Sequence, residues 1–447
     1  MGQHAIRRGI VVVVAALLAA TACSEDRSGG ADADEGGGTE TTAAASVDCA
    51  GEDLVECARA SSIGAVVPDE ATAATGEPIV IGMINQEDTP VGSFPELSRS
   101  ARAAVDFVNE QLGGIGGRPI ELQVCNTKFS AEGSTACGQQ FVAAGAPVVL
   151  GGIDVFGNGV DVLAENEVPY VGGIPVSTQS VKSPNSFQWS GGTWGAVIAF
   201  ASHAATELDA TSVAIVYGDF GSVSDAAEYG RRTLEELGVD DVQMVPYPIV
   251  ATDLSSPVQA AATGDPDAIM MLVADTGCAP AFEAVSAAAL RAQPFYTGAC
   301  AAPPIVERAG AERTDGALFN VEGPIDREDP TPDTQLYNSV LAEYSDGLDP
   351  IGAATVSFRA FMNLYVVMAE LAADGGAEAV TPKAITDSLR AQVDTPSFMG
   401  HPYTCDGRQL EGLPAMCSPQ QILGVMQDEE LTQVGDWIDV GAIYGKG

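Results

Sequence analysis

The sequence predicts an α/β protein with two doubly wound, parallel-sheet lobes. Three observations predict this fold class. From Glu77 onward, short apolar runs typical of buried strands alternate with amphipathic segments of helical period. The alternation starts again near Trp194, which indicates a second unit of the same kind. The chain has 447 residues, of which 46% are hydrophobic, and this is enough for two or three domains with real cores.

The first lobe is expected over residues 77–194. Its first strand, 78–84, is a continuous apolar run, and the amphipathic helix 94–112 that follows ends at a pair of glycines. The next elements are expected in the order strand 120–125, helix 134–144, strand 147–152, helix 159–165 and strand 168–171. Repeated βαβ units of this kind build a parallel sheet that helices cover on both faces.

The second lobe is expected over residues 195–324. Its elements are expected in the order helix 194–208, strand 212–217, helix 222–237, strand 242–250, helix 257–263, strand 268–274, helix 279–290, strand 294–296 and strand 317–322. Because the carboxyl ends of parallel strands carry the ligand-binding loops of open α/β sheets, two such lobes favour a ligand cleft between them.

The remaining C-terminal elements have to pack back on the two lobes. Helices are expected near 333–344 and 353–373 and after Pro382, followed by a turn-rich, mixed tail from Pro396. Residues from about 325 to 395 are expected to complete the first lobe, and residues 396–447 the second. The helix 353–373 contains Arg359 and Glu370, which favours an amphipathic helix over a membrane span.

Residues 1–22 have the pattern of a lipoprotein signal peptide. Arg7 and Arg8 precede a short apolar segment, and small residues then lead to Cys23. Cleavage would leave Cys23 as a lipid-carrying N-terminus at the outer face of the cytoplasmic membrane. The alternative is simple secretion, because residues 21–22 also suit an ordinary cleavage site and Ala20 stands where a lipobox usually has leucine.

Residues 23–76 are expected to form an acidic, flexible tether that contains one small disulfide loop. Residues 24–42 are rich in Glu, Asp, Gly and Thr and lack apolar periodicity, so they cannot bury enough surface to fold. The whole chain carries 61 acidic against 20 basic residues, a formal net charge of −41. This charge excludes nucleic acid and anionic membrane surfaces as favourable partners.

Cysteine usage indicates the oxidising side of a membrane. Eight cysteines remain when Cys23 is set aside, none at C-x-x-C spacing, and three histidines are too few for zinc sites. The sequence does not fix their connectivity, but neighbours pair most easily. The expected disulfides are therefore Cys49–Cys57, Cys125–Cys137, Cys278–Cys300 and Cys405–Cys417.

Catalysis is not expected. His4 belongs to the signal peptide, and neither His203 nor His401 lies near a nucleophile pattern. The sequence contains no G-x-S-x-G, H-E-x-x-H or Walker motif. We therefore expect no enzyme activity, no cofactor and no metal.

Several stretches together carry a resemblance to a known family. They are residues 78–84 and 89–94, 103–119, 125–137, 168–173 and 214–220. In this order and spacing they resemble the type I periplasmic (solute) binding proteins, the group that includes the Leu/Ile/Val-binding proteins of ABC importers. The resemblance covers about residues 77–447. It implies two lobes joined by a hinge of several strands, with the ligand held by loops that follow the strands.

The resemblance also implies a set of ligand-binding residues. They are Phe94, Asp154, Val155, Phe156, Ile174 and Val176 in the first lobe, and Phe220, Asp275, Thr276 and Ala301 in the second. Each has an ordinary structural alternative, because the aromatic residues could belong to the cores and the aspartates could cap helices.

The sequence departs from the family pattern where an amino acid ligand would bind. The loop at Val155 and Phe156 lacks a small hydroxyl residue, and Pro175 has no N–H to donate. No acid stands near Ala301 to receive an ammonium group, although Asp275 could replace it from another wall. The aromatic residues Phe94, Phe156, Phe220 and Tyr296 favour a ligand with apolar or aromatic surface.

These observations predict a lipid-anchored, monomeric solute-binding protein that delivers a small organic ligand to an ABC permease. The ligand expected is an amino acid-like compound, an amide, or an aromatic or apolar acid. One alternative is a sensor that passes ligand occupancy to a separate receptor. A less favoured alternative is a hydrolase of the cell envelope.

Overall fold

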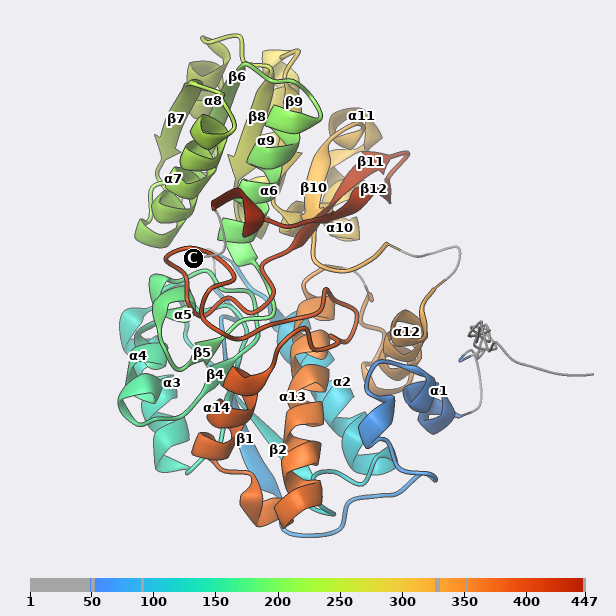
Figure 1. The fold of residues 1–447 in the computed structure, drawn as a ribbon. Coiled ribbons are helices and arrows are strands. Elements are labelled where there is room, and N and C mark those ends of the chain that lie inside the picture. Colours follow the sequence, from blue (N-terminus) through green and yellow to red (C-terminus); the bar gives the residue numbers. More distant parts are fainter. Residues whose placement is uncertain (1–48, 50–52, 90–91, 326–329, 351, 445–447) are drawn as a thin grey trace, which may run out of the picture. The chain divides into compact units, whose positions relative to one another are not determined.

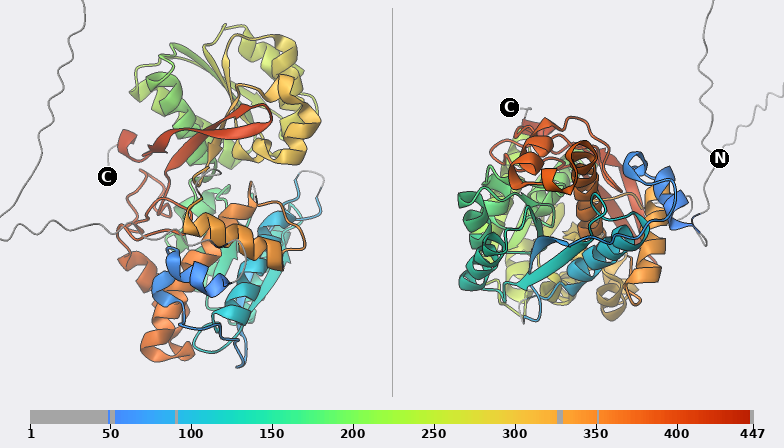
Figure 2. Two further views of the ribbon diagram at one scale, coloured as in Figure 1. Left: turned by 90° about the vertical axis from the view of Figure 1, so that its right-hand side faces the viewer. Right: turned by 90° about the horizontal axis from the view of Figure 1, so that it is seen from below.

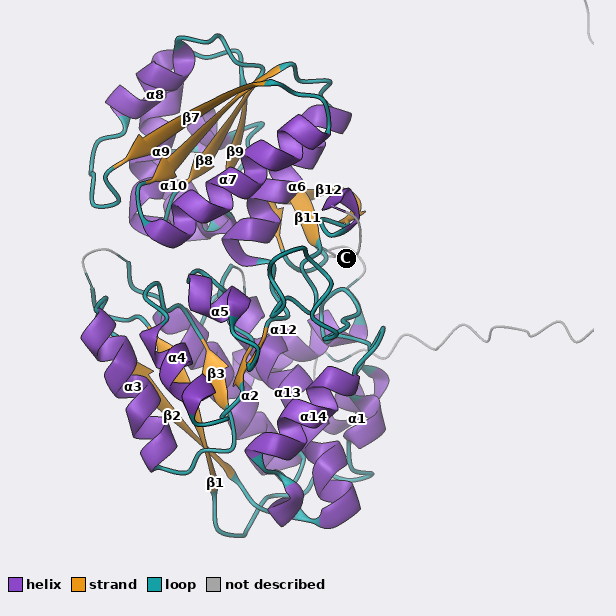
Figure 3. Cartoon of the chain, turned by 60° about the vertical axis from the view of Figure 1, so that its left-hand side comes forward, coloured by secondary structure: helices purple, strands orange, loops and turns teal. Residues whose placement is uncertain are grey.

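Two separate β-sheets organise the chain, and helices lie on both faces of each (Figures 1 and 3). The computed structural model describes residues 49, 53–89, 92–325, 330–350 and 352–444. The expected signal peptide and Cys23 lie outside these residues. The sheets confirm the α/β class with two parallel-sheet lobes, and both lobes belong to one compact unit.

The sheet of lobe 1 has five strands, all parallel, in the order β2-β1-β3-β4-β5. The strands are β1 Ile79–Asn85, β2 Ile120–Asn126, β3 Val149–Gly151, β4 Tyr170–Val171 and β5 Ser186–Phe187. The helices of this lobe are α1 Leu54–Ala60, α2 Pro95–Gln111, α3 Ala131–Ala143, α4 Asn158–Glu165, α5 Thr178–Lys182, α12 Pro332–Tyr344, α13 Ala354–Gly375 and α14 Pro382–Ala391.

The sheet of lobe 2 has seven strands in the order β12-β11-β10-β9-β8-β6-β7. They are β6 Ser212–Gly218, β7 Asp241–Tyr247, β8 Ala268–Leu272, β9 Gln293–Tyr296, β10 Leu318–Val321, β11 Gln421–Gln427 and β12 Glu430–Ile438. Its helices are α6 Gly192–Thr206, α7 Gly221–Glu236, α8 Ser255–Ala262, α9 Asp275–Ala288, α10 Pro303–Ala309 and α11 Ala311–Thr314.

Alternate residues of β1 supply the two cores of lobe 1. Ile81 and Met83 face one way and pack with α2, α12 and α13. Gly82 and Ile84 face the other way, where Phe141 of α3 packs with residues of α4. The strand is apolar along its whole length because both faces are buried, as parallel sheets require.

The central strand of lobe 2 follows the same rule. Val213 and Ile215 of β6 pack with α6 and α7. Ala214 and Val216 point to the opposite face, where they pack with α8 and α9. Each lobe is therefore a three-layer unit, and its polar groups collect at the ends of the strands rather than on the faces of the sheet.

The C-terminal part of the chain differs in detail from the expected pattern. The turn-rich tail contains the hairpin β11–β12, which extends the lobe 2 sheet in the antiparallel direction. The segment between α14 and β11 contributes to both lobes, because Cys405 and Cys417 join the core of lobe 1 while Leu410 and Leu413 join that of lobe 2. The residues of this segment from 396 onward were expected to complete the second lobe.

Ordered structure begins before Glu77. Helix α1 lies beside α12, and its residues Val55 and Ala58 belong to the core of lobe 1 (Figure 2). The carboxylate of Asp53 accepts hydrogen bonds from the first backbone N–H groups of the helix and caps it. The C-terminal part of the expected tether is thus a packed element of the lobe.

Four disulfides join the cysteine pairs expected from the sequence. They are Cys49–Cys57, Cys125–Cys137, Cys278–Cys300 and Cys405–Cys417. Among the described residues one helix, α13, is long and apolar enough to cross a membrane, and 72% of that stretch is buried inside the protein. We therefore interpret α13 as a core helix of lobe 1, in line with the expectation from its charged residues.

Replacing Gly82 with alanine tests the packing of β1 against α3. A Cβ atom at residue 82 would lie 2.5 Å from Cγ of Phe141, so the buried ring has to move. We expect Gly82→Ala to lower stability by about 1–3 kcal/mol, the usual effect of overpacking a core, and to lower the midpoint of thermal unfolding measured by circular dichroism. Gly221→Ala is the control, because nothing lies within 4 Å of its Cβ position. Equal midpoints for both variants would contradict this packing.

Candidate functional site

Loops at the carboxyl ends of the two sheets contact each other. The rings of Phe156, after β3, and Phe220, after β6, meet edge to face with centroids 5.7 Å apart. Ser93, before α2, lies near Asp275 at the start of α9, where its backbone N–H opposes the rise in the pKa of that carboxylate. We call these segments, residues 92–96, 127–129, 152–157, 219–220 and 274–276, the interlobe loops. They form the candidate ligand site.

Three phenylalanines form an aromatic cluster that includes both lobes. Phe129, from the loop after β2, lies with its ring centroid 5.3 Å from that of Phe156, which in turn contacts Phe220. Phe129 has a φ of 51°, a left-handed conformation that is costly for a bulky residue. Such strain persists only where the surroundings impose it and is typical of ligand-contacting segments.

Asn126 holds the loop that carries Phe129. Its amide oxygen accepts hydrogen bonds from the backbone N–H groups of Glu87 (3.1 Å) and Lys128 (2.8 Å). Its amide nitrogen donates to the carbonyl of Glu87 at 2.8 Å. The loops after β1 and β2 are therefore fixed to each other by one side chain at the end of a strand.

Asp154 positions the loop that carries Phe156. Its buried carboxylate accepts a hydrogen bond from Ser134 Oγ at 2.6 Å and from the backbone N–H of Phe156 at 3.3 Å. Ser134 Oγ also accepts a hydrogen bond, at 2.7 Å, from the backbone N–H of Gly159 in the first turn of α4. Burial raises the pKa of Asp154, and these hydrogen bonds oppose the rise. The carboxylate of Asp154 therefore makes its hydrogen bonds to residues of lobe 1.

Carboxylates gather where α2 and α9 approach each other. Burial raises the pKa of Glu96 to about 7, with smaller contributions in the same direction from Asp275 and Glu87. Burial also raises the pKa of Asp275, while backbone N–H groups of Thr276 and Ser93 oppose the rise. A ligand group that is positively charged or rich in hydrogen-bond donors would be stabilised at this end of the site.

The other expected ligand-binding residues have different surroundings. Phe94 is buried in the lobe 1 core, and its carbonyl accepts a hydrogen bond from Asn85 Nδ2 at 2.8 Å. Tyr296 is buried in a core of lobe 2, against which Ala301 packs. Three residues, Val155, Ile174 and Val176, are partly buried against the core of lobe 1. Thr276 is exposed in the first turn of α9.

The structure adds residues that the sequence analysis did not select. Phe129 and Ser93 both follow strands of lobe 1, as Phe156 does, but the set of ligand-binding residues implied by the resemblance did not include them. Glu96 gave no such signal, because an acid in the first turn of a helix is commonplace. Its proximity to Asp275 depends on the contact between the lobes.

The described residues contain no cluster suited to a metal ion, and both described histidines lie against aromatic rings. No group of three or more His, Cys, Asp or Glu side chains in this part of the chain could hold a metal ion. His203 packs on Phe295 with ring centroids 6.0 Å apart, and His401 packs on Trp437 at 5.4 Å. Both histidines are therefore used in aromatic packing.

A hollow on the surface of lobe 2 lies outside the interlobe loops. It is lined by β7, the turn after it and α8, including Tyr247, Pro248 and Ala251. The charged residue in this lining is Asp253, and its carboxylate accepts a hydrogen bond from the backbone N–H of Ser255 at 2.8 Å. The hollow does not bring charged groups of different elements together, so we place the candidate site at the interlobe loops.

Comparisons with known proteins agree with this arrangement. The model of a family described as periplasmic binding protein matches residues 78–413. No curated protein matches the chain.

The chain is also similar in fold to solved structures. A leucine-binding protein LivK from Thermotoga maritima has a TM-score of 0.65 and 16% identity, with 80% of this chain and 98% of that chain covered. A possible leucine/isoleucine/valine-binding protein from Rhodopirellula baltica has a TM-score of 0.70 at 11% identity, covering 82% and 98%. The protein LivJ from Streptococcus pneumoniae, solved in complex with isoleucine, has a TM-score of 0.63 at 15% identity, covering 80% and 99%.

The raised pKa of Glu96 predicts a pH-dependent stability. Because the folded protein binds this proton more tightly than the unfolded chain, the contribution of Glu96 to wild-type stability falls as pH rises from about 4.5 through about 7. Glu96→Gln removes this loss, so we expect the variant to be more stable at pH 8 by about 2 kcal/mol after solvent screening, and similar to wild type at pH 4.5. Thermal midpoints across this range check it.

The exposed Glu165 of α4 offers a matched control for Glu96. Glu165→Gln makes the same chemical change at an exposed site, where we expect no comparable gain in stability at pH 8. A Glu96→Gln profile that runs parallel to the wild-type profile between pH 4.5 and 8 would show that Glu96 does not titrate in this way.

Proposed function

The chain belongs to the periplasmic binding protein family, and from this membership we propose that it captures a small organic ligand outside the cytoplasm for an ABC importer. The observation that supports the proposal is the contact between loops of both sheets, where the rings of Phe156 and Phe220 pack edge to face. A ligand held by loops from both lobes has contacts that exist only when the lobes are together. Such a ligand shifts the population toward the closed form.

We propose that the ligand is amino acid-like, an amide, or an aromatic or apolar acid. The aromatic cluster of Phe129, Phe156 and Phe220 favours an apolar or aromatic body. Asp275 and Glu96 favour an amine or amide end with hydrogen-bond donors. Among the three ligand classes, these side chains suit an aromatic or apolar compound with an amino or amide group best.

We propose that Cys23 carries a lipid that holds the protein at the outer face of the cytoplasmic membrane, where a permease receives the ligand from a monomer. The signal-peptide pattern and the acidic segment after Cys23 support this arrangement. Globomycin, which blocks lipoprotein signal cleavage, should retain the precursor and change its mobility on gels. An unchanged mature product released into the medium would instead indicate simple secretion.

A thermal-shift screen tests the binding function. A compound that binds only the folded state raises its stability, by about 2.7 kcal/mol at a concentration one hundred times Kd. The library should contain amino acids, their amides, aromatic acids and short peptides. We expect a dose-dependent rise for members of the first three classes. If no compound of a broad library gives a rise, the proposed function loses its main support.

Phe220→Ala tests the aromatic cluster with a compound found in that screen. The variant loses a half-buried ring at the interlobe loops, so we expect it to fold and to need about tenfold more compound for the same shift, equal to about 1.4 kcal/mol of binding energy. Tyr344→Ala is the control, since it removes a half-buried ring from α12. It should lower the midpoint without changing the dose dependence. An unchanged dose dependence in Phe220→Ala would remove Phe220 from the site.

A further inference from the structure

In the part of the chain that the structure describes, the backbone passes between the two sheets at three places, and one side chain of the second passage contacts the other two. The passages lie between β5 and α6, after β10, and before β11. We call their described residues 188–192, 321–325 and 416–421 the crossing segments. The first and third lie side by side, because the N–H of Gln188 donates to the carbonyl of Ala415 and the N–H of Cys417 donates to that of Gln188, both at 2.8 Å.

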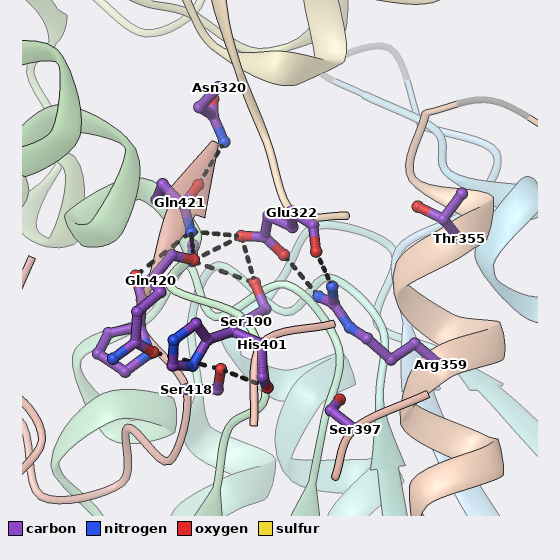
Figure 4. A network of polar contacts seen from close by, with 12 residues as sticks. Ser190, Asn320, Glu322, Thr355, Arg359, Ser397, His401, Ser418, Gln420 and Gln421 are labelled. Atoms are coloured by element: carbon purple, nitrogen blue, oxygen red, sulfur yellow. Dashed lines mark hydrogen bonds and ion pairs between the residues drawn. The ribbon is translucent and has the colours of Figure 1, made fainter. Parts of the chain in front are cut away.

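Glu322, in the second crossing segment, binds both of the others (Figure 4). Its Oε1 accepts hydrogen bonds from Ser190 Oγ at 2.7 Å and from the backbone N–H of Gly192 at 3.2 Å. The same oxygen accepts from Gln421 Nε2 at 3.2 Å. Asn320 orients Gln421, because its amide nitrogen donates to Gln421 Oε1 at 3.0 Å.

The other oxygen of Glu322 binds lobe 1. Glu322 Oε2 lies 2.9 Å from Arg359 Nη2, and the Glu322 carbonyl accepts a second hydrogen bond from Arg359 Nη1. Arg359 belongs to the core helix α13, so this pair connects the crossing segments to the interior of lobe 1. One residue thus contacts lobe 1, the first turn of α6 and the first strand of the C-terminal hairpin.

The pair is buried, which makes it sensitive to the loss of either partner. The side chain of Arg359 is 4% exposed and that of Glu322 is 10% exposed. Arg359 Nε has no hydrogen-bond partner in the described part of the chain, so Glu322 supplies the counter-charge and the hydrogen bonds of this guanidinium group. A buried charge without its partner is strongly unfavourable.

The crossing segments are also closely packed. A Cβ atom at Gly191 would lie 2.6 Å from Gln421 Nε2 and 2.6 Å from the carbonyl oxygen of Pro419. Close packing restricts the backbone rotations by which a few residues absorb the motion of two lobes.

We propose that Glu322 is the residue that couples the crossing segments and thereby sets how readily the two lobes separate. Rotation of lobe 2 relative to lobe 1 has to change the contacts of Glu322, because its partners belong to both. While these contacts hold, the three segments move as one hinge. When they are broken, each segment bends independently and the range of lobe separations widens. This role does not depend on which ligand the protein binds.

Distance measurements on the ligand-free protein test the proposal. Spin labels carried by non-natural amino acids, which leave the four disulfides intact, replace the exposed residues Glu165 on α4 and Glu236 on α7. Double electron–electron resonance then gives the distribution of distances between the lobes. We expect Glu322→Gln to broaden this distribution and to shift its mean to longer distances. A folded Glu322→Gln protein with the wild-type distribution would overturn the proposal.

Two further variants separate coupling from stability. Glu322→Gln alone leaves Arg359 buried without a counter-charge and is expected to lower the thermal midpoint. Glu322→Gln with Arg359→Met removes both charges and is expected to regain much of that loss. Ser190→Ala removes one hydrogen bond to Glu322 and keeps the ion pair.

These variants also keep the test decisive if Glu322→Gln does not fold. A broadened distribution in the double variant, at a recovered midpoint, supports coupling by Glu322, and a smaller broadening in Ser190→Ala supports it further. Wild-type distributions in both proteins would show that the Glu322–Arg359 pair has only a structural role.

Discussion

Burial of both faces of each sheet is the constraint on which the rest of this structure depends. Strands such as β1 and β6 have apolar side chains toward helices on either side, so their faces leave little room for charged groups. Polar residues are therefore concentrated at strand ends and in connections. Asn85 and Asn126 at the ends of β1 and β2, and Asp154 after β3, organise loops by hydrogen bonds instead of contributing to a core.

The sequence predicted the central strands best, because burial on both faces acts directly on their residues. The strand expected at 78–84 is β1, Ile79–Asn85, and that expected at 212–217 is β6, Ser212–Gly218. Two-sided burial leaves a continuous apolar run that can be recognised without tertiary information. The disulfides were predictable for a related reason, since each links cysteines separated by 8 to 22 positions.

Features that depend on contacts distant in sequence were not predictable in the same way. Helix α1 has seven residues, too few to show a period, and it is stabilised by packing on α12, which lies about 270 positions later. The candidate site has the same property. Phe156 and Phe220 were implied by the family resemblance, whereas the environment of Glu96 depends on its burial and on Asp275 from the other lobe. The Glu322–Arg359 pair joins a loop to the middle of an apolar helix, and neither segment alone indicates the other.

Two polar regions of the lobe interface differ in charge balance. At the crossing segments, the negative charge of Glu322 is matched by Arg359 and by hydrogen-bond donors from both lobes. At the interlobe loops, burial raises the pKa of Glu96, Asp275 and Glu87 add to the rise, and Arg99 opposes it. The negative charge at the crossing segments is therefore balanced within the protein, whereas the interlobe loops carry carboxylates of both lobes near one another. A ligand that brings hydrogen-bond donors or positive charge to these carboxylates would add contacts that join both lobes, so lobe contact and ligand capture would favour each other.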